Sequence, residues 1–138
     1  MEETHYLTRD ELLALNKHAV EALGGNAGIQ SPRAFEVVID QPQQVVFGQE
    51  VYPTVWLKAA YMMQQIIKTP VFVDGSKRTA GLVALHFLHQ NGYQPVGDDY
   101  DDVAKGFIFE MVQKENSEET MTLIAEWLSA KFGPVENN

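Results

Sequence analysis

Cysteine is absent from this chain of 138 residues, and cations are few. Without cysteine there is no disulfide framework, no thiolate metal site and no cysteine nucleophile. Lysine and arginine number 10 against 19 aspartate and glutamate residues, a formal net charge of -9. This acidity disfavours a general affinity for nucleic acid or for an anionic membrane. We therefore expect no nucleic-acid partner and no membrane partner, and the missing cysteine suits a cytoplasmic protein.

Long apolar runs are also missing. No stretch approaches the length needed to cross a bilayer, and the polar amino terminus lacks the layout of a secretory signal. The length and the 45% hydrophobic content are typical of one ordinary globular domain. We expect residues 1–133 to form a single domain and residues 134–138 to form a polar C-terminal tail, and we leave the oligomeric state open.

The pattern of apolar residues and helix signals is almost wholly helical. The stretch 77–90 is apolar nearly all round, which is typical of a helix buried in the middle of a domain. Residues 43–53 are expected to form a loop, and residues 93–96 a short extended segment. Helices are expected over about 8–23, 31–41, 54–68, 77–90, 99–114 and from 117 to the Gly133-Pro134 pair. We predict an all-α bundle of about six helices around a buried central helix.

Residues 72–79, Phe-Val-Asp-Gly-Ser-Lys-Arg-Thr, carry the most informative chemistry. Gly75 lets the backbone approach a ligand. Lys77 and Arg78 lie in the first turn of the central helix, where the macrodipole disfavours cations, so their presence indicates an anion bound between them. Phosphate fits best, Asp74 could hold a divalent metal that bridges phosphates, and Lys68 adds a third cation. The alternative is an ordinary helix start, with Asp74 as the cap and the cations solvated.

Several blocks of the sequence, in order and with similar spacing, resemble the death-on-curing (Doc) branch of the Fic family. The blocks are residues 6–13, the glycine-rich loop 24–29, and residues 52–60, 72–80 and 87–93. Together they extend over nearly the whole chain. The resemblance implies the helical fold of the Fic/Doc family.

The resemblance also implies a function. Fic proteins commonly transfer a nucleotide monophosphate to a hydroxyl side chain of a target protein (AMPylation). Doc-type members instead act as kinases that use ATP and a metal ion to phosphorylate a threonine of translation elongation factor Tu, and so arrest growth. They are toxins held inactive by a small antitoxin protein. We therefore expect such an antitoxin as partner, and possible action on a protein such as elongation factor Tu.

The resemblance assigns roles to residues of the turn. ATP or another nucleotide, with Mg²⁺, would be the cofactor pair, and Asp74 would contact the metal. Gly75, Ser76 and Lys77 would cradle phosphates, and Arg78 would stabilise the charge that develops in transfer. Arg78 and Lys77 are the expected residual catalytic residues. The nucleotide-binding set expected from the match is Phe72, Gly75, Ser76, Lys77, Arg78 and Thr79.

The chain departs from the family signature, His-x-Phe-x-Asp-Gly-Asn-Lys-Arg-Thr, at polar positions. Pro70 occupies the position of the histidine that serves as general base, and proline cannot accept a proton. Losing a positioned base typically costs about 10²–10⁴-fold in rate. Ser76 replaces the asparagine, and Leu57 replaces a glutamate that the family usually has. From these three departures we expect a catalytically impaired protein. His86 and His89 lie some turns along the central helix and are not expected to replace the base.

Three hypotheses stay open. An impaired Doc-like protein, or pseudoenzyme, would bind nucleotide without modifying a target. An active transferase that uses a base from elsewhere, or none, would modify its target slowly. A non-catalytic binding module would keep the toxin fold only to engage an antitoxin or another partner, through the second helix, the loop 43–53 or the faces beside the turn.

Overall fold

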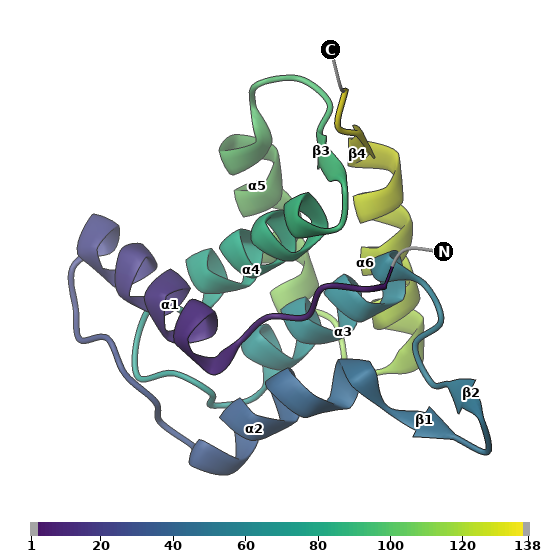
Figure 1. Cartoon of the computed structure of the whole chain (residues 1–138). Helices are drawn as coiled ribbons and strands as arrows, with labels where there is room; N and C mark the ends of the chain where they lie inside the picture. The colour runs from purple at the N-terminus through teal and green to yellow at the C-terminus, as the bar shows by residue number, and fades with distance from the viewer. Residues whose placement is uncertain (1–2, 137–138) are drawn as a thin grey trace.

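The computed structural model describes residues 3–136, and over them the chain forms six α-helices, one 3₁₀ turn and two small antiparallel ladders. Figure 1 shows α4 crossing the middle of the molecule, with α1, α3 and α5 around it and α6 beyond α3. The helices are α1 (Arg9–Leu23), α2 (Pro32–Asp40), α3 (Val55–Lys68), α4 (Ser76–Gln90), α5 (Tyr100–Val112) and α6 (Glu118–Lys131). The prediction of an all-α bundle around a buried central helix is confirmed.

The helices begin where their capping residues predict. Thr8 and Glu11 form a complete capping box, with hydrogen bonds of 2.9 and 3.1 Å. At the start of the three helices α2, α3 and α6, a hydroxyl accepts a backbone N–H three residues ahead, and these caps are Ser31, Thr54 and Ser117. Local hydrogen bonds that satisfy orphan N–H groups therefore fix most of the helix starts.

The core surrounds α4. This helix buries Ala80, Gly81 and Ala84 together with the larger Phe87 and Leu88. The small residues let neighbouring backbones approach closely, and α3 packs most extensively against α4. The helix α4 contacts α1, α3 and α5, so its position in the fold is fixed by several neighbours. Within the described part of the chain, no helix is both long enough and apolar enough to span a bilayer.

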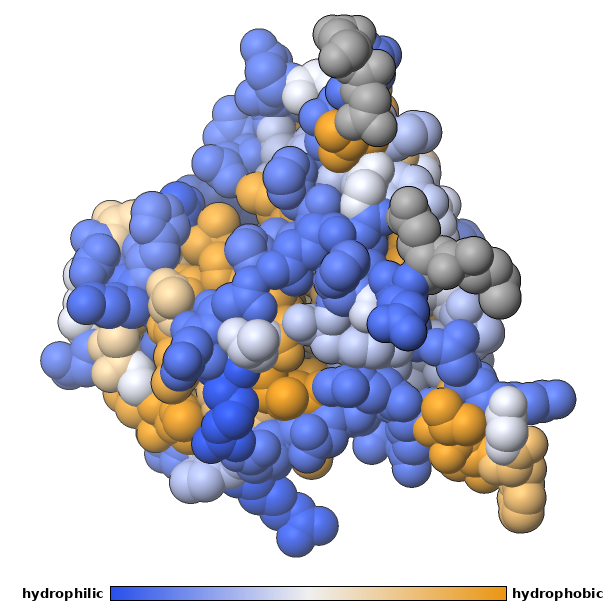
Figure 2. Space-filling view, viewed as in Figure 1, coloured by the Kyte–Doolittle hydropathy of each residue, from blue (hydrophilic) through white to orange (hydrophobic). Residues whose placement is uncertain are grey.

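The predicted loop 43–53 was only partly right. The 3₁₀ turn η1 (Gln41–Gln43) continues past α2, and β1 (Val45–Val46) then pairs with β2 (Gln49–Glu50) in a projecting hairpin. Phe47 and Gly48 both have positive φ, at 51° and 75°, which the two-residue turn of a hairpin requires. Phe47 is fully exposed, and Figure 2 shows the apolar side chains of this hairpin reaching the surface at lower right.

The segment after α6 is also more ordered than expected. Strand β4 (Phe132–Pro134) pairs with β3 (Tyr93–Pro95), and the Val135 N–H donates to the Gly92 carbonyl at 2.8 Å. The first residues of the predicted polar tail therefore lie against the end of α4. Residues 137–138 of that tail lie outside the described residues, and the domain boundary stays a prediction.

Candidate functional site

The glycine-rich loop and residues 71–74 lie side by side. Ile29 and Phe72 form an isolated antiparallel bridge, and the Val73 N–H donates to the Gly28 carbonyl at 2.9 Å. The Phe72 ring is buried and packs edge-to-face on Phe35, with ring centroids 6.2 Å apart. This buried anchor fixes the chain just before the turn that begins α4.

The start of α4 has no side-chain cap. Its N-cap residue is Gly75, in the left-handed conformation with φ 76°, and no side chain bonds to the first turn. The N–H groups of Ser76, Lys77 and Arg78 therefore lack the side-chain acceptor that is present at the starts of α1, α2, α3 and α6. Uncapped N–H groups at a helix start form a ready site for an anion.

The Asp74 side chain turns away from the helix and binds the glycine-rich loop. Its Oδ2 accepts the Asn26 N–H at 2.8 Å, so the alternative in which Asp74 caps the helix is wrong. A Cβ atom built on Gly25 would lie 2.9 Å from that same oxygen, and Gly25 has φ 110°. The carboxylate is thus held by a loop that only glycine allows to come so close.

Asp74 suits a metal that phosphates help to hold. Across residues 3–136 there is no cluster of three or more histidine, aspartate or glutamate side chains that could bind an ion alone. One oxygen of Asp74 remains beside the loop contact. Mg²⁺ is commonly bound by one or two carboxylates together with substrate phosphates and water, so the donor set fits such an ion.

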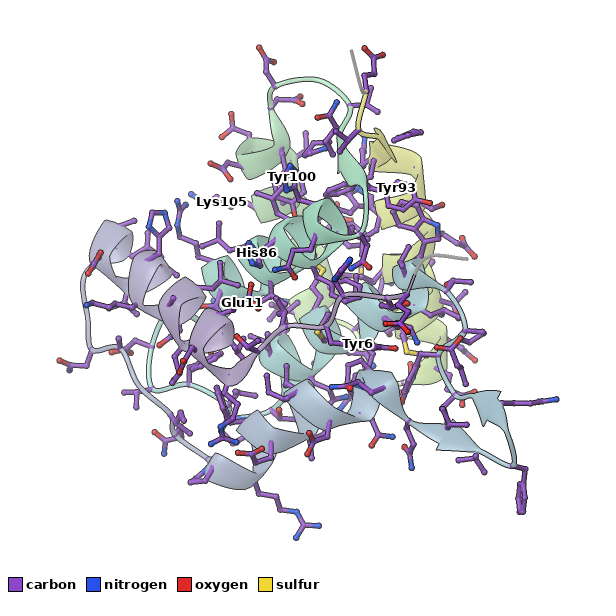
Figure 3. All side chains as sticks on the ribbon, viewed as in Figure 1. Tyr6, Glu11, His86, Tyr93, Tyr100 and Lys105 are labelled. Atoms are coloured by element: carbon purple, nitrogen blue, oxygen red, sulfur yellow. The ribbon has the colours of Figure 1, made fainter. Side chains whose placement is uncertain are left out.

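The two cations of the turn border a cavity of about 330 Å³ between the end of α1, the first half of α4 and α5. Lys77 is exposed, whereas the Arg78 Nε is buried and has no hydrogen-bond partner among the described residues. A buried guanidinium N–H without an acceptor is uncommon in folded proteins and fits a bound anion. Figure 3 shows Tyr100 and Lys105, two further lining residues, on α5.

The structure brings only part of the predicted nucleotide-binding set to the surface. Gly75, Ser76, Lys77 and Arg78 gather at the start of α4. The Phe72 side chain is buried in the core. Thr79 is fully buried and donates to the Gly75 carbonyl at 2.7 Å. These last two side chains support the turn from inside.

Lys68 does not join the basic group, contrary to the prediction. Its Nζ donates to the Val112 carbonyl at 2.8 Å and to the Lys114 carbonyl. A cation is favourable at a helix C-terminus, so Lys68 caps the end of α5.

Sequence reasoning missed Asn16. This residue of α1 is 1% exposed, and its amide contacts the Asp74 carbonyl, the Thr79 hydroxyl and the Gly28 N–H. The only signal was a polar residue placed four positions after Leu12 in the apolar stripe of α1. Such a position is more often occupied by an apolar residue, so a buried amide there indicates a polar network.

Neither histidine of α4 lies at the turn. Pro70 is exposed directly after the extended residue Thr69. His86 lies ten residues after Ser76, about 15 Å along α4, and its Nε2 is 2.9 Å from the Glu11 Oε2 (Figure 3). His89 lies further along the helix and is exposed.

Glu11 is the acidic partner of His86. Burial alone would raise the pKa of Glu11, but hydrogen bonds from His86, Thr8 and Gln90 outweigh it and lower the pKa to about 2. The pair joins α1 to α4 well away from the turn. It is thus a structural contact that lies outside the turn.

Comparison with known proteins shows the family of the chain. The model of the Fic/DOC family matches residues 6–88, which include the loop, the turn and nearly all of α4. The chain is 33% identical over 112 residues to "Toxin Doc" of Mycolicibacterium smegmatis, covering 81% of this chain and 84% of that protein. It is 32% identical over 89 residues to "Protein kinase doc" of Escherichia phage P1, covering 64% and 70% respectively. The chain therefore belongs to the Doc branch of the Fic/Doc family.

Proposed function

We propose that this chain is a toxin–antitoxin protein of the Doc type that retains a nucleotide site but transfers phosphate poorly. Its two matched relatives are named a toxin and a protein kinase. The observation that carries the proposal is the uncapped start of α4 beside Asp74 and the unpaired Arg78 Nε. The N–H groups and the guanidinium suit the phosphates of ATP or another nucleotide, and Asp74 suits a Mg²⁺ ion bound with them.

Each group has a separate part in binding. The N–H groups of Ser76, Lys77 and Arg78 donate to phosphate oxygens, and the guanidinium adds a charge-assisted hydrogen bond. Asp74 would be the residue that holds Mg²⁺. Mg²⁺, when bound, neutralises phosphate charge.

The weak step is proton removal from the target hydroxyl. Position 70 supplies no acceptor, and the loss corresponds to about 10²–10⁴-fold in rate. Arg78 and the helix start still stabilise negative charge, so slow transfer to a hydroxyl side chain remains. The Doc resemblance indicates elongation factor Tu as the target to test, with phosphate transfer ahead of AMPylation.

A second candidate function, binding without catalysis, is favoured by the cavity beside the turn. Leu23 and Phe109, both 66% exposed, line it, and Lys77 and Lys105 add positive charge. An amphipathic, acidic segment of a small antitoxin fits this chemistry. Such a partner would contact Lys77 and Arg78, the same cations that face the nucleotide.

Calorimetric titration with Mg-ATP separates the two functions. The matched variants are Asp74→Asn and Arg78→Gln, with Lys131→Gln at the far end of α6 as control. Since a hydrogen bond to a charged group contributes about 1.5–3 kcal/mol, we expect each site variant to bind at least about tenfold more weakly than the parent. The Asp74→Asn effect should vanish when Mg²⁺ is chelated.

Absence of Mg-ATP binding by the parent protein would contradict the proposal. A tight complex with a small acidic protein would then leave the binding module as the better account. Equal affinities of the parent and both site variants would show that nucleotide binds elsewhere.

A further inference from the structure

Asn16 bonds to three segments that meet at the turn where α4 begins. Its Nδ2 donates to the Asp74 carbonyl at 2.9 Å and to the Thr79 Oγ1 at 3.2 Å, and its Oδ1 accepts the Gly28 N–H at 3.0 Å. The residue is 1% exposed, so water does not compete for these bonds. Both hydrogens and one lone pair of the amide are used.

The direction of these bonds is fixed. Thr79 gives its own hydrogen to the Gly75 carbonyl at 2.7 Å, so its oxygen can only accept from Asn16. Asn16 therefore holds the carbonyl of Asp74 directly and that of Gly75 through Thr79. Aspartate at position 16 would set an acceptor against these oxygens, and alanine would leave the partners without bonds.

Holding a carbonyl also aims the next N–H. The peptide group is planar and trans, so its C=O and its N–H point in opposite directions. Fixing the carbonyls of Asp74 and Gly75 thus orients the N–H groups of Gly75 and Ser76, at the point where α4 begins. No other side chain of the described residues bonds to these two carbonyls.

The third contact of Asn16 holds the glycine-rich loop. The Gly28 N–H donates to Asn16, and the Gly28 carbonyl accepts the Val73 N–H. Two residues earlier in the same loop, the Asn26 N–H donates to the Asp74 carboxylate. We infer that Asn16 is a positioning residue. It orients the N–H groups of the turn, and it fixes the position of the Asp74 carboxylate through the glycine-rich loop. The effect on ligand affinity rests on the proposed nucleotide site, whereas the effect on the turn does not.

Amide hydrogen exchange by NMR tests the inference without a ligand. The variants are Asn16→Ala and Asn16→Asp. The control is Gln64→Ala, which removes another buried amide, one that bonds to Asn116 and Ser117 between α3 and α6. In both Asn16 variants we expect the Asn26 and Val73 N–H groups to exchange at least about tenfold faster than in the parent. These rates are compared after normalisation to the exchange rates of amides in the core of α4. Asn16 touches neither group, so their exchange reports position and not a lost contact.

Mg-ATP affinity of the folded variants gives the second readout. We expect a loss of about tenfold or more in the Asn16 variants and none in Gln64→Ala. Faster exchange confined to Gly28, or unchanged affinity in a variant with a loosened turn, would overturn the inference. If the parent protein binds no nucleotide, the proposed function fails and the exchange pattern alone decides the role of Asn16. Should Asn16→Asp not fold, Asn16→Ala supplies both readouts.

Discussion

At the residue scale, Gly25 is the glycine with the least room for a side chain, because it lies against Asp74. A methyl group at position 25 would lie 2.9 Å from the Asp74 Oδ2, on a backbone with φ 110°. Gly92, with φ 94° and open space around its Cβ position, offers the same backbone strain without the contact. We expect Gly25→Ala and Gly92→Ala each to lower the free energy of unfolding by about 1–2 kcal/mol.

Only Gly25→Ala should also weaken the Mg²⁺-dependent part of ATP binding, because it displaces the carboxylate. Urea unfolding and calorimetry measure the two effects. Equal Mg²⁺ dependence in both variants would show that the carboxylate position does not matter for the ligand.

Glu11 gives a residue-scale prediction on pH. Its pKa in the folded protein, about 2, lies below the ordinary value of 4.5, so its contribution to stability is complete above about pH 5 and is lost as pH falls toward 2. Because the side chain is 30% exposed and solvent screens it, we expect a contribution of about 1 kcal/mol. Glu11→Gln should flatten the pH dependence of urea unfolding between pH 5 and 2.

Glu21→Gln, an exposed carboxylate on the same helix, is the control for this effect. It should leave the slope in that pH range close to that of the parent. A parental slope in Glu11→Gln would mean that another acid governs acid unfolding.

At the scale of elements, one buried lysine fastens the β1–β2 hairpin to α3. The Lys58 Nζ donates to the carbonyls of Pro42 and Tyr52 and to the Glu50 carboxylate, and the residue is 1% exposed. Lys58→Met would leave two buried carbonyls unpaired, so we expect a loss of about 2–4 kcal/mol. Glu50→Gln should cost under about 1 kcal/mol, because its side chain is half-exposed and the backbone contacts remain.

Urea unfolding compares these two variants, and exchange of the Val51 N–H, which bonds to the Gln44 carbonyl, follows the hairpin itself. Lys58→Met should raise that exchange more than it raises exchange in α4. Equal stability losses in the two variants would assign the anchoring to the ion pair and not to the carbonyls.

Elements with local signals were predictable from the sequence, and those with distant partners were not. Caps such as Thr8, Ser31 and Thr54 bond within one turn, so the helix starts follow directly from nearby residues. Strand β4 pairs with a segment far away in the chain, and Phe47 is an unusual residue for a left-handed turn. Neither feature leaves a short-range pattern.

The same limit applies to the site. Gly75 to Arg78 are contiguous, so their gathering at the start of α4 was predictable. Asn16 reaches the turn from another helix, and Lys68 finds its acceptors at the end of α5. Both depend on how helices pack, which local signals do not specify.

At the scale of the whole molecule, the central helix connects the site to the fold. Its N-terminus carries the proposed nucleotide site, its middle packs in the core, and its C-terminal end leads to the β3–β4 ladder that holds the segment after α6 (Figure 1). The chain has a net charge of -9, and the cations beside the turn form a local positive region on it. This arrangement favours a small anionic ligand over a polyanion.

The central claim is that this chain is a Doc-type protein whose site lacks chiefly the base at position 70. Pro70→His tests it, since the position is exposed and lies next to extended backbone. Transfer of labelled phosphate from Mg-ATP to elongation factor Tu is measured for the parent, for Pro70→His and for Pro70→Ala. The account predicts a gain of about 10²–10⁴-fold for Pro70→His and none for Pro70→Ala. A Pro70→His protein that binds Mg-ATP as the parent does and still transfers no phosphate would contradict it.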